Sequence, residues 1–333
     1  MAIFLSILFI AIVMEFFLRI FGPPYYRFNN LSQEYYSNPR GYHDVVRKEG
    51  KHTVYGLTYH EDDHGYRISP VDNQAPEESA EKQILGIGDS FTYGRGVRYE
   101  DICLTRLEKM LNNGQHSVAV KNCGVVGAGI EEVVEIYARE STSLPSGSLV
   151  IYGLVLNDFG FGFSDSIKGL NFIDINNGGN TFSILRKKSA LINFISHRID
   201  TRRLHTSTLE AYLESFEGES ADNGFNLLEE MNHQIHENEN ELLVVIFPLL
   251  YDFDEYRFKS IHRKIEAFCD SHEIFFLDLF PAFSRHTAED LWANPTDHHP
   301  NETAHRIAAD EITAFIEREA PGFSHRHVRA VSE

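Results

Sequence analysis

The chain has 333 residues, of which 42% are hydrophobic and 24% are charged, as in an ordinary globular protein. Its formal net charge of −19 disfavours nucleic acid as a partner, because no excess of basic residues would offset the repulsion of phosphates. The three cysteines, Cys103, Cys123 and Cys269, form neither a CxxC pair nor a zinc-binding spacing, and an odd number suits no disulfide framework.

An almost unbroken apolar stretch, AIFLSILFIAIVMEFFLRIF, occupies residues 2–21 and ends at the sequence GPP. About 20 apolar residues can span a bilayer, and Glu15 and Arg19 lie one helical turn apart, where they can pair. No A-x-A-like cleavage site follows, so we expect residues 1–21 to be a retained single-pass anchor; an amphipathic docking helix is the alternative. The positive-inside tendency favours a cytoplasmic main domain, because basic residues follow the stretch: Arg27, Arg40, Arg47, Lys48 and Lys51.

Residues 22–82 form a lead segment that ends in an acidic linker, NQAPEESAEK, and within it the stretch at 59–70 can supply a strand or two against the main body. From residue 83 the pattern changes to short, wholly apolar runs that alternate with helical patterns, such as those at 101–113 and 256–272. Such alternation is typical of a doubly wound α/β domain with a buried parallel sheet. The predicted strands are 84–87, 118–123, 149–154, 241–248 and 274–279.

Roughly eighty residues separate the third predicted strand from the fourth. They contain helical patterns, and long structureless loops are rare in compact domains, so we expect a helical insert over 160–236. The α/β domain is expected to cover 83–318, followed by a frayed tail at 319–333.

Polar residues and glycines follow the predicted strands at the points where ligands bind in open α/β sheets. Ser90 comes directly after the first strand, in GDS, and a glycine-rich loop with Gly127 follows the second. Asn157 follows the third strand, and Asp297 and His299 come after the fifth. We therefore expect a serine, a glycine loop, an asparagine and an Asp-His segment to meet at one edge of the sheet.

These residue types are the ones that acyl transfer requires. A serine hydroxyl needs a base to take its proton, and the imidazole of His299 has a suitable pKa. Asp297 would hold that imidazole in the correct tautomer. The N–H groups of Ser90 and Gly127 and the side-chain amide of Asn157 would bind the oxyanion.

The four blocks GDSFTYG, NCGVVG, GLVLND and DHHPN resemble, in order and spacing, those of the SGNH (GDSL-type) hydrolase superfamily, in a membrane-anchored bacterial type. The resemblance covers about residues 83–318 and implies a three-layer α/β/α sandwich with a five-stranded parallel, flavodoxin-like sheet. It also implies that Ser90 is the nucleophile, His299 the base, and Gly127 and Asn157 oxyanion donors. The family's acid commonly lies three positions before the base, where this chain has Thr296, so we assign that role to Asp297, two positions before it.

Simpler interpretations remain for single residues. Ser90 can be a helix N-cap, Asn157 can cap a turn, and Gly127 can serve packing alone. A metal site at His298, His299 and His305 is disfavoured because no acidic or cysteine ligands accompany them. GIGDSF and GAGIEE lack the third glycine of the dinucleotide fingerprint, and we expect no cofactor.

We expect a membrane-anchored serine esterase that acts on a small acyl ester or an acylated carbohydrate. An O-acyltransferase on the same site is the first alternative, and a catalytically silent carbohydrate-binding domain is the second. The resemblance favours an extracytoplasmic catalytic domain, against the basic residues that follow the apolar stretch.

Overall fold

The computed structural model describes residues 2–21, 51–54, 57–70, 80, 82–112, 118–159, 188–192, 194–195, 209–294 and 297–320. The chain divides into two compact units, one formed by residues 1–45 and 163–212 and the other by 46–162 and 213–333. The predicted tail, apart from residues 319–320, and most of the predicted insert before residue 209 lie outside the described residues.

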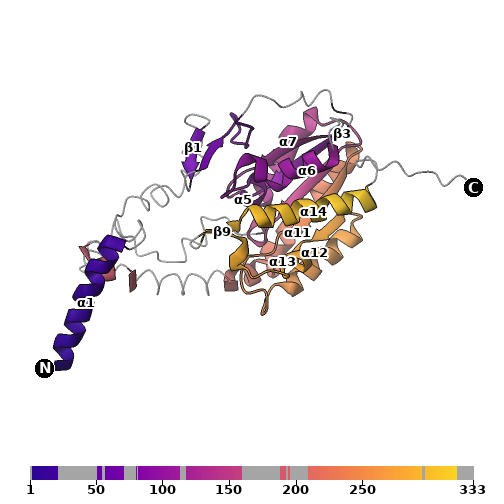
Figure 1. Cartoon of the computed structure of the whole chain (residues 1–333). Helices are drawn as coiled ribbons and strands as arrows, with labels where there is room; N and C mark the ends of the chain where they lie inside the picture. The colour runs from indigo at the N-terminus through magenta and orange to yellow at the C-terminus, as the bar shows by residue number, and fades with distance from the viewer. Residues whose placement is uncertain are drawn as a thin grey trace, which may run out of the picture. The chain divides into compact units, whose positions relative to one another are not determined.

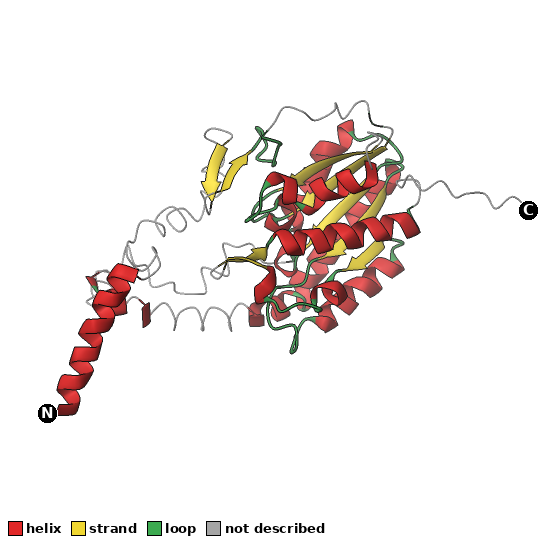
Figure 2. Ribbon diagram, in the orientation of Figure 1, coloured by secondary structure: helices red, strands yellow, loops and turns green. Residues whose placement is uncertain are grey.

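A five-stranded parallel sheet forms the centre of the larger unit (Figures 1 and 2). Its strands follow the order β4-β3-β5-β6-β7, which is the flavodoxin-like order 2-1-3-4-5. The strand at the sheet centre is covered on both faces: all six residues of its sequence LVIYGL, at 149–154, are buried. The predicted α/β fold with a five-stranded parallel sheet is therefore confirmed, with strand bounds β3 Lys82–Gly88, β4 Val118–Gly124, β5 Leu149–Leu154, β6 Glu241–Ile246 and β7 Phe275–Asp278.

Helices cover both faces of this sheet (Figure 2). On one face α6 (Cys103–Asn112) packs against α14 (Glu302–Glu319). On the other, α7 (Ile130–Glu140) packs against α11 (Gly218–Glu237), which contacts α12 (Lys259–Ser271) through the rings of Phe225 and Phe268. The larger unit also contains two four-residue helices, α5 (Ser90–Tyr93) and α13 (Phe280–Phe283).

Helix α11 lies within the range 160–236 that the sequence analysis assigned to an insert, yet it packs on β6 and α7. It buries one apolar face, which includes Leu228, Met231 and Ile235, as the crossover connection from β5 to β6. The larger unit resumes at residue 213 and includes α11.

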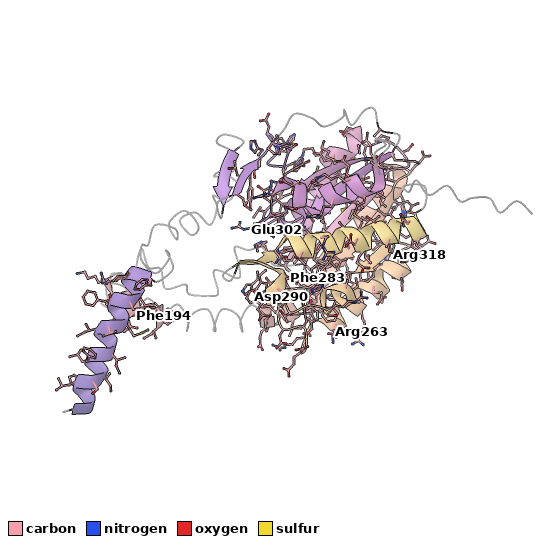
Figure 3. The ribbon with its side chains drawn as sticks, in the orientation of Figure 1. Phe194, Arg263, Phe283, Asp290, Glu302 and Arg318 are labelled. Atoms are coloured by element: carbon pink, nitrogen blue, oxygen red, sulfur yellow. The ribbon has the colours of Figure 1, made fainter. Side chains whose placement is uncertain are left out.

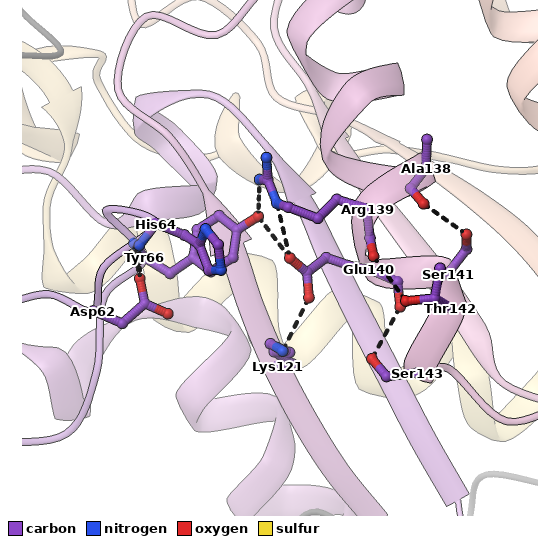
Figure 4. A network of polar contacts seen from close by, with 10 residues as sticks. All are labelled: Asp62, His64, Tyr66, Lys121, Ala138, Arg139, Glu140, Ser141, Thr142 and Ser143. Atoms are coloured by element: carbon purple, nitrogen blue, oxygen red, sulfur yellow. Dashed lines mark hydrogen bonds and ion pairs between the residues drawn. The ribbon is translucent and has the colours of Figure 1, made fainter.

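Residues 57–70 of the lead segment pack on the α/β domain. Strand β2 (Leu57–His60) pairs antiparallel with β1 (Lys51–Val54). The Tyr66 hydroxyl donates to Glu140 of α7 at 2.9 Å and accepts from Arg139, while Lys121 of β4 pairs with Glu140 at 3.0 Å (Figure 4). These contacts tie the lead segment to β4 and α7 of the α/β domain.

A second two-stranded sheet lies at the end of the domain where α14 begins. Its strands are β8 (Trp292–Asn294) and β9 (Asp297–Pro300), which pair antiparallel. Asn301 follows as the N-cap of α14, and its side chain accepts from the N–H groups of Thr303 and Ala304. The Asn301 amide also donates to the carbonyl of Trp292 at 3.2 Å, so the cap ties the hairpin to the helix.

The smaller unit contains helix α1 (Ala2–Phe21), which is long and apolar enough to cross a membrane. Segment 188–192 of the same unit hydrogen-bonds to its Glu15.

His305 is buried between α14 and the first turn of α6, where its Nδ1 accepts from the Cys103 N–H at 3.3 Å. Burial lowers the pKa of His305 to about 3. An unfolded histidine titrates near 6.5, so below that pH the unfolded chain gains a proton that the folded chain does not bind. We expect this group to reduce the free energy of unfolding by about 1.4 kcal/mol for each pH unit between 6.5 and 3.

The variant His305→Gln keeps an acceptor but cannot titrate. Urea unfolding at pH 7 and pH 5 should show a decrease that is about 2 kcal/mol smaller in the variant than in the parent. An equal decrease in both proteins would contradict the assignment.

Candidate active site

Ser90 is the first residue of α5, directly after β3, and is 6% exposed. Asp89 caps this helix by accepting from the Phe91 N–H at 2.8 Å. The N–H of Ser90 stands at the first position of the helix, where the helix itself supplies no acceptor. The serine therefore presents its hydroxyl and its N–H at the carboxyl end of β3.

Helix α5 lies so close to the strand ends that three neighbouring positions have no room for a side chain. A Cβ added to Gly88 or Gly153 would come within 2.4 or 2.2 Å of Thr92 Oγ1, and one added to Gly124 within 2.3 Å of the Tyr93 nitrogen. Gly88 also has a φ of +148°, which side chains rarely adopt. These glycines fix the height of Ser90 above the sheet.

Asn122 fastens the same turn from β4. Its Nδ2 donates to the carbonyl of Thr92 at 2.9 Å, and its Oδ1 accepts from the N–H of Gly124 at 2.9 Å. In the loop beyond, Gly127 has a φ of +80°, and a Cβ added there would meet no heavy atom within 4 Å. The predicted oxyanion donor Gly127 therefore stands at an open position after β4.

The hairpin β8–β9 brings His299 to Ser90, 209 residues away in the chain. His299 Nε2 lies 2.9 Å from Ser90 Oγ, and the imidazole is half-buried beside the ring of Phe91, at 5.5 Å between centroids. Two residues that the sequence placed at one edge of the sheet thus make direct contact.

The sequence analysis assigned no role to Asp89, which proves to be central. Its carboxylate is 1% exposed, and Oδ2 accepts from both Ser90 Oγ and Asn157 Nδ2 at 3.3 Å. Burial raises the pKa of Asp89, while the Phe91 N–H, His299, Asn157 and Ser90 act in the opposite direction. The shorter contact of Ser90 Oγ is the one to His299, so the hydroxyl has its better acceptor there.

Asn157 lies in the 3-10 turn Leu156–Asp158 after β5. One of its two amide hydrogens serves the contact to Asp89, which leaves the second for a bound group. The turn is held by Asp158, whose Oδ2 accepts from the Tyr152 hydroxyl at 2.8 Å and from the Val155 N–H at 3.1 Å. Burial and the neighbouring Asp89 raise the pKa of Asp158.

Aromatic rings support the hairpin from outside. Trp292 Nε1 donates to the carbonyl of Leu250 at 2.8 Å, and the Trp292 ring stacks on His298 at 3.9 Å. The Tyr251 ring packs edge-on against the His298 ring, at 5.0 Å between centroids. The segment that follows β6 is therefore the outer wall of the hairpin that carries His299.

A buried relay fixes that wall. The Leu249 N–H donates to the Tyr256 hydroxyl at 3.1 Å, and that hydroxyl lies 3.0 Å from His262 Nε2. His262 Nδ1 in turn lies 3.0 Å from Asp278 Oδ1, at the end of β7. Because a carboxylate only accepts hydrogen bonds, His262 Nδ1–H donates to Asp278, and the neutral imidazole then accepts at Nε2 from the Tyr256 hydroxyl. Nothing in the sequence pattern pointed to these three residues, which come from a loop, a helix and a strand.

Asp297 lies in β9 with His299, and its side chain is outside the described part of the structure. Among the residues that the structure describes, no group of three or more His, Cys, Asp or Glu side chains is arranged to hold a metal ion. What the described geometry offers is a serine hydroxyl paired with an imidazole, beside a buried carboxylate that also binds the Asn157 amide.

The model of the GDSL-like Lipase/Acylhydrolase family matches residues 87–307, and no curated protein sequence matches the chain significantly. Among similar solved structures is a lipolytic protein of the G-D-S-L family from Veillonella parvula DSM 2008, with 13% identity, coverage of 71% of this chain and 99% of that one, and a TM-score of 0.42. The acetylxylan esterase Axe2 from Geobacillus stearothermophilus has 11% identity, coverage of 75% and 100%, and a TM-score of 0.45. A two-domain esterase active on acetylated mannans has 12% identity, coverage of 71% and 50%, and a TM-score of 0.42.

The relay at Tyr256 yields a prediction about His299. Tyr256→Phe leaves the buried Leu249 N–H without its acceptor, which costs about 1–3 kcal/mol and loosens the wall behind His298. We expect the rate at which a fluorophosphonate modifies Ser90 to fall roughly threefold to tenfold, because small displacements of a catalytic pair reduce reactivity steeply. Quenched-flow labelling of folded protein measures this rate.

Tyr137→Phe is the matched control, because Tyr137 bonds Gln234 and Asn238 away from the hairpin. It should leave the labelling rate unchanged. Identical rates in the two variants would show that the relay does not position His299.

Proposed function

We propose that this chain, which belongs to the GDSL-like lipase/acylhydrolase family and is a hydrolase acting on esters, cleaves its substrate through an acyl-enzyme on Ser90. The contact of 2.9 Å between His299 Nε2 and Ser90 Oγ carries the proposal. A serine becomes a nucleophile when a neighbouring base takes its proton, and this pair has the required distance.

In the first step Ser90 Oγ attacks the ester carbonyl while its proton passes to His299 Nε2. The tetrahedral oxyanion would accept hydrogen bonds from the N–H groups of Ser90 and Gly127 and from the Asn157 amide. Collapse of this intermediate expels the alcohol, which takes the proton from His299. Water, deprotonated by His299, then attacks the acyl-enzyme and releases the carboxylic acid and free Ser90.

Asp89 would act as a positioning residue in this mechanism. Its buried carboxylate accepts from Asn157 Nδ2 and so holds the amide beside Ser90. The same carboxylate caps α5, so nucleophile and oxyanion donor share one anchor. A fixed donor stabilises the transition state without reorganising when charge develops.

We assign the role of the acid to Asp297. It lies two residues before His299 in β9, and residues two apart share one face of a strand. A carboxylate on that face is suited to hold the imidazole in the tautomer that accepts a proton at Nε2.

The substrate class in this proposal is a small acyl ester or an acylated carbohydrate, and the chain attaches to a membrane through residues 2–21 with an extracytoplasmic catalytic domain. Helix α1, long and apolar enough to span a bilayer, supports the attachment.

Labelling of the full chain in detergent with a fluorophosphonate tests the nucleophile. The parent should be labelled on Ser90, because the imidazole activates only this hydroxyl, and Ser90→Ala should lose all label. Ser284→Ala, which removes an exposed serine, should label like the parent. Label that persists on Ser90→Ala would place the nucleophile elsewhere.

Asp297→Asn tests the acid. We expect turnover of an acyl ester to fall by several orders of magnitude, on the order of 10⁴-fold in the best-studied triad, because the amide favours the wrong tautomer. Steady-state kinetics and a melting curve measure the change, which should spare the fold. Asp290→Asn, an exposed acid just before the hairpin, is the control. A loss below about tenfold would show that another group orients His299.

A further inference from the structure

Helix α1 carries one acid, Glu15, within an otherwise apolar stretch. Its carboxylate pairs with Arg19 at 2.6 Å, but most of its hydrogen bonds come from a segment about 175 residues later in the chain. Glu15 accepts from the Ser189 hydroxyl at 2.8 Å, the Ala190 N–H at 3.0 Å and the Leu191 N–H at 2.8 Å.

Arg19 completes the contact by donating to the carbonyl of Lys188 at 2.6 Å. Ser189 is itself fixed, because its hydroxyl accepts from the Ile192 N–H at 3.1 Å. Both Glu15 and Arg19 therefore form hydrogen bonds with the later segment. We call residues 188–195 the docking segment; Phe194, labelled in Figure 3, lies beside α1.

The buried and half-buried side chains of α1 form a single stripe along the helix. Leu18 is 5% exposed, and Ala11 and Glu15 are half-buried; these three positions follow the i, i+4, i+7 spacing of one helix face. On the docking segment, Ala190 is 6% exposed. The other large apolar side chains of α1 remain open, from 37% exposed at Met14 to 70% at Phe4.

Two consequences follow. The docking segment has its partners only in a chain that keeps residues 2–21, so these contacts favour a retained anchor over a cleaved signal sequence. Glu15 also lies six residues before the end of α1, which is about 9 Å along the helix axis. A segment that satisfies this carboxylate must reach the edge of the apolar layer in which the rest of α1 is immersed.

We propose that the docking segment is a second membrane-contacting element, which the Glu15–Arg19 pair clamps to α1 at the boundary between headgroups and acyl chains. Its occupant on the open side is phospholipid, which Ile195, 49% exposed, faces together with the open side chains of α1. The docking segment is thereby held at the bilayer surface, and this does not depend on the chemistry of the α/β domain.

The test uses the full chain with Ser90→Ala, so that its result does not depend on the proposed chemistry. Ile195→Cys is labelled with bimane; the native cysteines are at most 2% exposed and do not compete. In vesicles of phosphatidylcholine and phosphatidylglycerol with lipids spin-labelled near the headgroup, we expect strong bimane quenching. Glu15→Ala should reduce this quenching at least threefold while the protein still floats with the vesicles.

Two results would overturn the proposal: bimane at 195 that is unquenched in the parent, or quenching that is the same with Glu15→Ala and Arg19→Ala combined. Ser6→Ala, elsewhere on α1, is the matched control and should keep the parental quenching.

A second measurement leaves the clamp intact. Benzoylphenylalanine at position 18, the buried face of α1, should crosslink to the peptide that contains residues 188–195 when the protein is in vesicles. The same group at position 9, where Phe9 is 68% exposed, should not. Crosslinking to that peptide from both positions, or from neither, would contradict the docking.

Discussion

The lack of space around Thr92 is the constraint on which the site depends. The first turn after β3 presses its backbone onto the ends of three neighbouring strands, and glycine at positions 88, 124 and 153 is what permits this approach. Thr92 stands between Gly88 and Gly153, and its carbonyl is held by Asn122. A side chain at any of the three glycines would lift α5, and Ser90 with it, from the strand ends.

From this fixed turn the other features follow. Asp89 must cap α5 at its buried end, so its carboxyl is removed from water and its pKa is raised. A buried carboxylate needs donors, and the Phe91 N–H and the Asn157 amide supply them. Asp158 is a second buried carboxylate, and it accepts hydrogen bonds from the Tyr152 hydroxyl and the Val155 N–H. Burial and the charge of Asp89 raise the pKa of Asp158, and shifted pKa values of this kind are common where a site is preorganised.

Much of this architecture is local in origin, and that part was predictable. Strand β5 is a continuous apolar run, and the predicted 149–154 coincides with it. Ser90 and His299 could be placed at one edge because parallel strands end on the same side of a sheet. The amphipathic pattern of α11 predicts a helix but does not say against which elements it packs, and its contacts to α7 and β6 appear only in the structure.

The residues that escaped prediction act through distant partners. Asp278, His262 and Tyr256 form a relay only after β7, α12 and the segment following β6 have come together. Their spacing of 6 and 16 residues matches no periodic pattern of one element. Asn301 had a local signal, an Asn directly before a helical stretch, but its bond to the Trp292 carbonyl depends on the hairpin.

His299 is carried by a hairpin, and this determines how the pair with Ser90 is kept in register. Two short contacts set the hairpin against the rest of the site. On the nucleophile side, a Cβ at Gly96 would come within 2.5 Å of the Ala293 Cβ, so the loop after α5 meets β8 without an intervening side chain. On the other side, Trp292 is bonded to the Leu250 carbonyl. Neither contact relies on a long flexible side chain, and a misplacement of about 1 Å can cost a factor of about 100 in rate. The separation of Ser90 and His299 is therefore set by the packing of the hairpin against the loop after α5 and against the segment after β6.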